Sequence, residues 1–559
     1  MKPRLDTPSL QRTDAISQGT YTTPEILAKF LVDWAVRNPS DTVVEPCCGD
    51  GVFLEAIASR IMQLEGNKSD VNRIIGVEID PHAAKQAYDR LLNHFQAGPK
   101  IIPKGFFSTL PSLPQESFDA VIGNPPFVKY RFFFKDEREL ALEFLQEQGF
   151  KASKLTNAWV PFLVAGIHLL KPKGRLAMVM PAELLQVSYA SEVREYLLNR
   201  FGFVFVVAFN SLVFPNVEQE IVLLMGIKGD EKGLRLIGVE DENALFELGR
   251  FPEVNIPQIP VEDSREKWTQ YFLRDDQRKA LREAMNNNLI TRLGQLCSVD
   301  VGVVTGKNRF FVLSKDDALK LEAQNHLLPV VTRTRYLQGL IFREHDWRGN
   351  VDTNRPSYLL AIKDASDFSE SLRKYITSGE EKNWHKNYKC SIRRLWYVVP
   401  SIWIPDAFLS RKIGSFPRLV LNSAEATCTD NLLRVKFKRT GFERIITTCF
   451  HNSLTSAFAE IFGRSYGGGV LELMPTEAEK LPVPIPKSNS KSLFSEMDKL
   501  IREGLQEEAI ELCDQRVLIE ELGCKKENIA IIKSAWRKLS KRRKSRHRRN
   551  LIHSQPIYN

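Results

Sequence analysis

The segment SFDAVIGNPPFVKY, residues 117–130, joins an apolar run to a short group of residues that could do chemistry. Asn124 carries a side-chain amide, and Pro125 and Pro126 separate it from the aromatic Phe127. Proline removes a backbone N–H donor and fixes φ, so the strand pattern cannot continue and the local carbonyls can point into a site. The group therefore offers hydrogen-bond acceptors on Asn124 and Pro125 beside the flat face of Phe127.

A second group follows the apolar strand pattern in VEPCCGDG. Gly49 and Gly51 stand where strand turns into helix, so the backbone can approach a ligand closely at the helix N-terminus. Leu54 stands where a dinucleotide site would have a third glycine, and Glu45 would repel a pyrophosphate but suits a cationic amino-acid group, as in a sulfonium cofactor. Glu78 ends the next strand, where a carboxylate can accept both hydroxyls of a ribose. Considered alone, Glu78 would be interpreted as a solvated strand-end acid, but its spacing behind the Gly-x-Gly strand favours the ligand contact.

The elements that must position these groups follow an alternating pattern. Over about the first 230 residues, apolar strands alternate with amphipathic helices, which is typical of a doubly wound α/β sheet. From about Gly226 the strands become shorter and less regular, and linker-like stretches such as FPEVNIPQIPVEDS appear. The pattern predicts an α/β domain over residues 1–245, a mixed α+β domain over 246–490, and a helical segment with a basic tail over 491–559.

Composition limits the class of protein. The chain has 559 residues, 43% hydrophobic and 26% charged, which indicates a globular protein of two or three domains. Its eight cysteines lack zinc spacing, so we expect reduced thiols, no metal and a cytoplasmic protein. No apolar run reaches about 18 residues, so no membrane span is expected.

The net charge of +10 is concentrated near the C-terminus. The segment RKLSKRRKSRHRRN, residues 537–550, contains nine Lys or Arg residues and no acid. Such a run is either a solvated, disordered tail or a contact to the phosphates of a nucleic acid. Arg542 and Arg543 are the candidates within it.

The order of the motifs resembles a known family. GTYTTPE, EPCCGDG, GVEID, KGFFS and NPPF follow one another as in gamma-class DNA adenine-N6 methyltransferases of type II restriction–modification systems, which are class I S-adenosylmethionine-dependent enzymes. The resemblance is strong over residues 18–225. It is looser in the C-terminal half, where PRLVLNSAEATCTDNLLRV and GRSYGGGVLELMPTEAEKLPVPIP resemble parts of a target-recognition domain. It implies a Rossmann-like methyltransferase domain followed by a DNA target-recognition domain.

The resemblance also implies a cofactor site and a reaction. S-Adenosylmethionine would be held by Thr22, Thr23, Glu45, Pro46, Gly49, Gly51, Glu78, Ile79, Phe107 and Asn124. One departure concerns the third motif, where many members have an acid before the aromatic residue and this chain has Gly105. The usual hydrogen bond to the adenine of the cofactor then lacks its acceptor, although Phe107 could still pack against that ring.

The implied catalytic group is Asn124, Pro125, Pro126 and Phe127. The 6-amino group of adenine is a poor nucleophile because its lone pair is delocalised into the ring. Acceptors on Asn124 and Pro125 would expose that lone pair to the methyl group. Phe127 would stack on a flipped base, where the family usually has Tyr, and Phe214 would cover its other face. An ordinary core aromatic is the equal alternative for Phe214.

In the region after residue 245, the candidates for contact with double-stranded DNA are residues able to read bases or hold phosphates. They are Arg309, Arg333, Arg335, Arg418, Asn422, Arg464 and Tyr466. The string GVVTGK is one spacer short of a phosphate-binding loop and is followed by Asn308, which excludes an NTPase. No nuclease cluster is recognisable, so any cognate restriction endonuclease would be a separate chain.

Other functions share the Asn-Pro-Pro-aromatic group. Protein-glutamine methyltransferases and some RNA methyltransferases have it, but a large module after the catalytic fold favours a reader of duplex DNA. An RNA methyltransferase remains the enzymatic alternative. A non-catalytic DNA-binding subunit is the other, although the intact Asn124–Phe127 group and cofactor loop argue against it.

Overall fold

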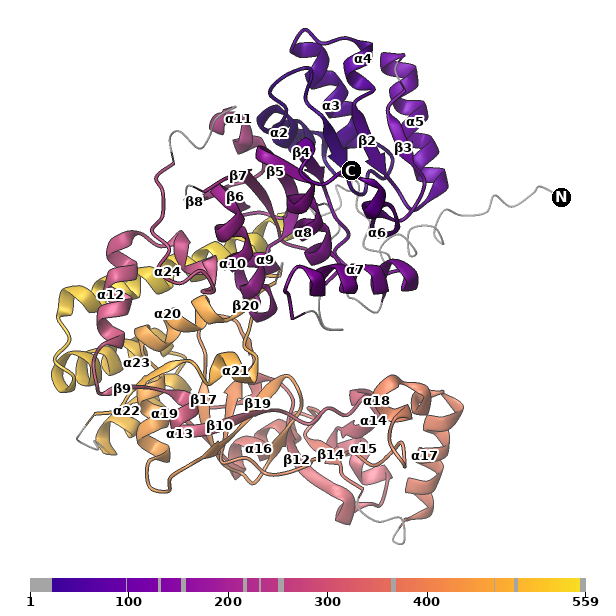
Figure 1. The fold of residues 1–559 in the computed structure, drawn as a ribbon. Helices are drawn as coiled ribbons and strands as arrows, with labels where there is room; N and C mark the ends of the chain where they lie inside the picture. Colours follow the sequence, from indigo (N-terminus) through magenta and orange to yellow (C-terminus); the bar gives the residue numbers. More distant parts are fainter. Residues whose placement is uncertain are drawn as a thin grey trace, which may run out of the picture. The chain divides into compact units, whose positions relative to one another are not determined.

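The computed structural model describes residues 23–552, except 97, 129–131, 152–156, 215–218, 231–232, 250–255, 363–367, 467 and 487–490, and except the side chains of 491 and 546–552. Contacts divide the chain into two compact units (Figure 1). The first comprises Met1–Phe272, Tyr466–Gly468 and Ser545–Asn559, and the second comprises Leu273–Ser465 and Gly469–Lys544. The domain boundary predicted near residue 245 falls on the short helix α11 (Leu245–Leu248) of the first unit.

The first unit contains an eight-stranded sheet in the order β3-β2-β1-β4-β5-β7-β6-β8. Strands β1 to β5 run parallel to one another, whereas β7 runs antiparallel to both β5 and β6. The strands are β1 Val43–Glu45, β2 Ile74–Val77, β3 Lys100–Ile102, β4 Phe118–Gly123, β5 Leu170–Pro181, β6 Phe201–Phe209, β7 Ile221–Lys228 and β8 Leu234–Val239.

Helices cover both faces of this sheet because successive strand residues point to opposite sides. In β4, Val121 joins a hydrophobic cluster with residues of α8, whereas Ala120 and Ile122 join a second cluster with α2 and α3. The predicted Rossmann-like α/β sheet is thus confirmed. The helices are α2 Glu25–Ala35, α3 Val52–Gln63, α4 Lys68–Val71, α5 Pro81–Phe95, α6 Phe106–Thr109, α7 Lys135–Glu147, α8 Trp159–Leu169, α9 Glu183–Gln186 and α10 Ser191–Arg200.

The strand order places a ligand crevice. From β1 the chain moves outward to β2 and β3, and then returns to β4 on the other side of β1. In open α/β sheets, ligands bind at the carboxyl ends of the strands where the order reverses. The ends of β1 and β4 are therefore the expected edge of the site.

The second unit combines small mixed sheets. Their orders are β10-β19-β15-β17-β13, β11-β14-β12-β18, β16-β21-β20 and β22-β9. The strands are β9 Ile290–Arg292, β10 Cys297–Val301, β11 Val312–Leu313, β12 Leu327–Val331, β13 Ile341–Arg343, β14 Tyr358–Leu360, β15 Ala407–Ser410, β16 Lys412–Ile413, β17 Leu419–Ser423, β18 Thr427–Cys428, β19 Leu432–Phe437, β20 Arg464–Ser465, β21 Leu471–Glu472 and β22 Pro482–Pro484.

The helices of this unit flank those sheets. They include α12 Asp275–Met285, α13 Leu293–Leu296, α14 Asn308–Phe311, α15 Lys315–Lys320, α16 Glu344–Asp352, α17 Glu370–Glu381, α18 Tyr388–Ser391, α19 Glu443–Phe450, α20 Ser453–Phe462, α21 Pro475–Ala478, α22 Lys491–Arg502, α23 Gln506–Cys513, the π-helix Asp514–Glu521 and α24 Lys526–Ile552.

The basic run is not a disordered tail over its described part. It lies on α24, where Trp536, Leu539 and Arg543 are buried. The Arg543 guanidinium donates to both carboxylate oxygens of Glu460 on α20, at 2.9 and 2.6 Å. This stretch of α24 is therefore part of the folded core.

The described residues also show the character of the helices and of the cysteines. None of their helices is long and apolar enough to cross a membrane. All eight cysteines are free thiols.

Candidate active site

The loop between β1 and α3 has two glycines with different tasks. Both adopt a backbone conformation with positive φ, which is 52° at Gly49 and 91° at Gly51. A Cβ on Gly51 would lie 2.9 Å from the Cβ of Ala87 on α5, whereas a Cβ on Gly49 would meet nothing within 4 Å. Gly51 therefore lets the loop pack on α5, and Gly49 faces open space that a ligand can enter.

Glu78 follows β2 and is fixed by two backbone groups. The N–H of Gly49 donates to Oε2 at 2.9 Å, and the N–H of Asp80 donates to Oε1 at 2.9 Å. Each carboxylate oxygen keeps a second lone pair, so both can still accept hydroxyl groups. The neighbouring Ile79 exposes 37% of its surface, which provides an apolar face beside this acceptor.

Glu45, at the end of β1, is a buried acid without a cation. Its residue is 1% exposed, and Oε2 has no hydrogen-bond partner among the described residues. Burial raises the pKa of this carboxyl well above its usual value, and the charges of Glu78 and Asp50 raise it further. An incoming ammonium group would satisfy it. The open Gly49, the Glu78 acceptor and this unpaired acid together fit a cofactor that has a ribose and a cationic amino-acid group.

Asn124 follows β4, which pairs with β1, so its side chain belongs to the same edge of the sheet. Its Nδ2 donates to Oγ1 of Thr23 at 3.1 Å, while its buried Oδ1 has no partner among the described residues. Pro125 is buried, and Phe127 is half-buried against both core clusters. The amide is thus held by its nitrogen, which leaves its carbonyl oxygen available to a donor.

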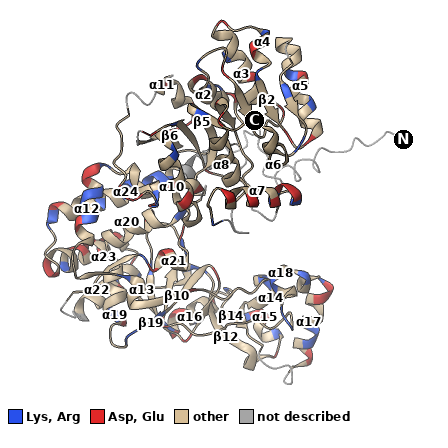
Figure 2. Ribbon diagram, in the orientation of Figure 1, with Lys and Arg blue, Asp and Glu red and all other residues tan. Residues whose placement is uncertain are grey.

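Glu137 is a residue that the sequence analysis missed. It lies on α7 and is 6% exposed, and its carboxylate accepts from the N–H groups of Phe107, at 2.7 Å, and Ser108, at 3.0 Å. A Cβ on Gly105 would lie 2.0 Å from this carboxylate. The Glu137 carboxylate therefore occupies the place of a side chain at position 105. Sequence spacing could not reveal this, because α7 has several acids (Figure 2) and only the fold selects one.

The predicted aromatic residues lie deeper than expected. Phe107 is 3% exposed, and its ring packs edge-on against Phe106 and Phe162 at 5.3 and 5.0 Å. Phe214 is 4% exposed and belongs to the cluster that contains α2. Their roles toward ligands stay predictions. Pro46 is buried in the loop, and Thr22 lies outside the described residues.

In the second unit, three predicted arginines are exposed. They are Arg309, Arg333 and Arg335. Arg333 and Arg335 line a groove of about 640 Å³ together with Lys412 and Asn431. Arg464 instead pairs with Glu477 at 3.1 Å. Tyr466, which belongs to the first unit, is 45% exposed.

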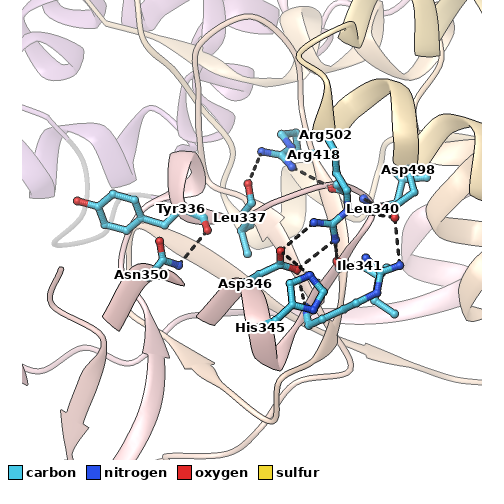
Figure 3. A network of polar contacts seen from close by, with 12 residues as sticks. Tyr336, Leu337, Leu340, Ile341, His345, Asp346, Asn350, Arg418, Asp498 and Arg502 are labelled. Carbon is cyan, nitrogen blue, oxygen red and sulfur yellow. Dashed lines mark hydrogen bonds and ion pairs between the residues drawn. The ribbon is translucent and has the colours of Figure 1, made fainter. Parts of the chain in front are cut away.

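The other candidates in the second unit are half-buried or buried, and their predicted contact with DNA stays a prediction. Arg418 is half-buried and lines the same groove as Arg333 and Arg335. Its guanidinium donates to the carbonyls of Leu337, at 3.1 Å, and Gly339, at 2.9 Å (Figure 3). Burial lowers its pKa to about 10. The amide of Asn422 donates to the carbonyls of Pro405 and Ala426, both at 2.8 Å. Arg543 is held by Glu460, and Arg542 is partly buried.

The segment held by Arg418 is also tied to α22 (Figure 3). Arg502 donates to Asp346 of α16 at 2.8 Å, and Asp498 accepts from the N–H of Leu340 at 2.7 Å. A Cβ on Gly339 would lie 2.0 Å from Asp498 Oδ1, so the contact requires glycine. The segment that follows Arg335 is therefore fixed from two sides.

The sheet order, the glycine loop with its acidic strand ends and the Asn-Pro-Pro-Phe group define a class I methyltransferase. Comparison with known protein families identifies the kind of methyltransferase. Residues 9–247 match the family described as N-6 DNA Methylase, and residues 265–518 match the family described as Type II methyltransferase M.Eco57I, C-terminal domain. The chain belongs to the N6-adenine DNA methyltransferases of type II restriction–modification systems.

Individual relatives agree with this membership. Type II methyltransferase M.AccI of Acinetobacter calcoaceticus is 23% identical over 82% of this chain and 84% of its own length. M.XamI of Xanthomonas campestris pv. amaranthicola is 22% identical over 83% and 85%. Among solved structures, the Type IIL restriction-modification enzyme MmeI in complex with DNA matches with a TM-score of 0.58 and 12% identity over 92% of this chain and 75% of that one, which shows a common fold.

Proposed function

We propose that this enzyme transfers a methyl group from S-adenosylmethionine to the N6 atom of an adenine that is flipped out of duplex DNA, and that it protects the sites of a separate restriction endonuclease. The observation that carries the proposal is Asn124, whose amide carbonyl is buried, unpartnered among the described residues and located beside the edge formed by Glu45 and Glu78.

The cofactor site uses residues at the ends of three neighbouring strands. Glu78 would accept the ribose hydroxyls, Ile79 would pack on the adenine, and Glu45 would receive the charge of the amino group. When bound, S-adenosylmethionine supplies a methyl group on a positively charged sulfur. Glu137 would take over the part of the acid that position 105 lacks, because its carboxylate occupies that place and can accept from the amino group of the cofactor's adenine.

The reacting nitrogen needs acceptors and does not need a strong base. Oδ1 of Asn124 and the carbonyl of Pro125 would accept the two N–H bonds of the 6-amino group, which exposes the nitrogen lone pair. Thr23 is a positioning residue. Its hydroxyl accepts a hydrogen bond from Nδ2 of Asn124, so the carbonyl oxygen of the Asn124 amide points away from Thr23. Phe127 would stack on the flipped base, and Phe214 remains the candidate for its other face.

Recognition of the DNA sequence belongs to the region after residue 245. The groove lined by Arg333, Arg335 and Asn431 offers guanidinium and amide groups of the kind that read base edges. Arg309 is exposed elsewhere in the same unit. Matches of the second half to the M.Eco57I C-terminal family and of the fold to a DNA-bound enzyme support this assignment.

The test is transfer of labelled methyl from S-adenosylmethionine to duplex DNA, to RNA and to protein, followed by nucleoside analysis. We expect N6-methyladenine at one sequence in duplex DNA. Label in RNA alone would favour the RNA methyltransferase, and no transfer with intact DNA binding would favour a non-catalytic subunit. Resistance of the product to an endonuclease with the same recognition sequence would test the proposed pairing.

A further inference from the structure

Two segments of the second unit contain no acidic residue. Residues 301–315 include Lys307 and Arg309, and residues 382–405 include three lysines and two arginines among 24 positions. The whole chain has 68 acids against 78 bases, so its charges are nearly balanced on average. These two segments instead carry a local excess of positive charge.

The two segments are joined into one rigid structure. Gly306, with φ of 82°, packs so closely on α18 that a Cβ would lie 3.0 Å from both Cys390 Sγ and Lys389 Cβ. Arg393 donates to the carbonyls of Val304 and Thr305, both at 2.9 Å. The loop 304–307 therefore belongs to the same surface as α18.

An aromatic cluster joins these two segments to α17. Phe310 stacks on Tyr375 at 4.6 Å, with an interplanar angle of 9°, and lies 4.7 Å from Trp396. The hydroxyl of Tyr375 donates to the carbonyl of Phe310 at 2.9 Å. Such packing fixes the position of the residues above it.

Large apolar side chains are exposed in the second of these segments. Tyr388 is 70% exposed, Ile392 62% and Leu395 40%. Lys386, Lys389 and Arg394 stand among them, and within the described part of the chain none of these three forms an ion pair with an acid. The acids that precede the segment are Glu380, which accepts from Nε1 of Trp396, and Glu381. We call these six residues, three apolar and three cationic, the α18 surface.

We propose that the α18 surface is a contact for duplex DNA that is separate from the groove at Arg333 and Arg335. The cations Lys386, Lys389 and Arg394 would hold backbone phosphates, and Tyr388 and Ile392 would lie against the sugars between them. Charge complementarity selects this partner, because unpaired cations around exposed apolar side chains match phosphates around sugars and bases. The proposal rests on the proposed function, since it adds a second contact to the same substrate.

The test compares full-length variants in DNA binding at several salt concentrations. Lys386→Ala, Lys389→Ala and Arg394→Ala combined should weaken binding to every duplex by roughly 10- to 100-fold and make the salt dependence shallower by about 0.9 in log–log slope per lost contact. Alanine at 389 keeps the Cβ that packs on Gly306, so the fold is preserved.

A matched control removes three lysines that are already neutralised in the same unit. Lys279, Lys374 and Lys499 are each at least 75% exposed in their side chains and paired with a glutamate four residues away. Their triple alanine variant changes net charge by the same amount and should bind DNA nearly as the wild type does.

A second variant separates apolar contact from charge. Tyr388→Ala should lower affinity several-fold with an unchanged salt slope, because no counterion is involved, and Tyr388→Phe should bind normally. The α18 surface proposal is overturned if the triple variant binds duplex DNA like its control, or if only RNA or protein binding changes. Methylation by the wild-type chain, measured in parallel, reports on the proposed function independently.

Discussion

Among single residues, Gly105 and Glu137 depend on each other. Gly105 has no side chain, and the carboxylate of Glu137, from α7, fills the space that a side chain there would occupy. Glu137→Ala should weaken binding of S-adenosylhomocysteine by roughly 1 to 3 kcal/mol, the scale for losing a charge-assisted hydrogen bond. Gly105→Asp alone should be damaging because its side chain meets Glu137. The double variant Gly105→Asp/Glu137→Ala should regain binding, as measured by calorimetry.

An analogue separates recognition from packing in this pair. Replacing the 6-amino group of the cofactor's adenine by oxygen should weaken binding to the wild type but not to Glu137→Ala. Equal loss in both proteins, or a double variant no better than Glu137→Ala, would show that Glu137 only supports the turn after β3.

Glu45 predicts a link between cofactor binding and pH. Burial raises the pKa of its carboxyl in the free protein, and a bound ammonium group would lower it. Between these two pKa values, binding must release a proton, so affinity should rise with pH across that window. Calorimetry in buffers of different ionisation enthalpy measures this release, and Glu45→Gln is the control that should lose it. Identical heats for wild type and control would contradict the role of Glu45.

The sequence predicted the residues of local motifs better than those joined by the fold. Asn124, Glu45 and Glu78 stand at strand ends, so periodicity and glycine turns place them at one edge. Glu137 and the carbonyl contacts of Arg418 depend on residues 30 or more positions away, as in the 81 positions from Arg418 to Leu337. Exposure of an arginine cannot be read from its type, so the sequence could not show that Arg543 is buried against Glu460.

At the scale of elements, α24 combines a core face with a basic run. The helical pattern in the sequence ends before the basic run, so α24 itself was not predicted. Trp536, Leu539 and Arg543 are buried, so removal of the run would cost stability as well as charge. The contact with α20 could not be predicted either, since tertiary contacts leave no local pattern.

The α24 core contact can be tested without truncation. Arg543→Ala leaves Glu460 buried without its partner and should destabilise the protein by about 3 kcal/mol, as for broken buried ion pairs. The neighbouring Lys541→Ala removes the same charge from an exposed position and should change stability by less than about 0.5 kcal/mol. Urea unfolding measures both, and equal midpoints would argue that Arg543 is not held as the structure has it.

For the whole molecule, recognition of the DNA sequence and non-specific contact with the DNA backbone should be separable by mutation. Arg333→Ala or Arg335→Ala should relax preference at one base pair by about 1 to 3 kcal/mol and change the salt slope little. Methylation of a library of site variants measures this preference. If Arg333→Ala and Arg335→Ala each lower methyl transfer equally at all sequences, the groove does not recognise bases.

In the proposed reaction, the carbonyl of Asn124 activates the adenine amine. Single-turnover methyl transfer by Asn124→Ala, with cofactor affinity measured on the same protein, tests it most directly. We predict a rate roughly 10²- to 10³-fold below wild type, the scale for removing one preorganised hydrogen-bonding group, with cofactor affinity nearly unchanged. A variant that binds S-adenosylmethionine normally and transfers methyl to adenine N6 at the wild-type rate would contradict the account.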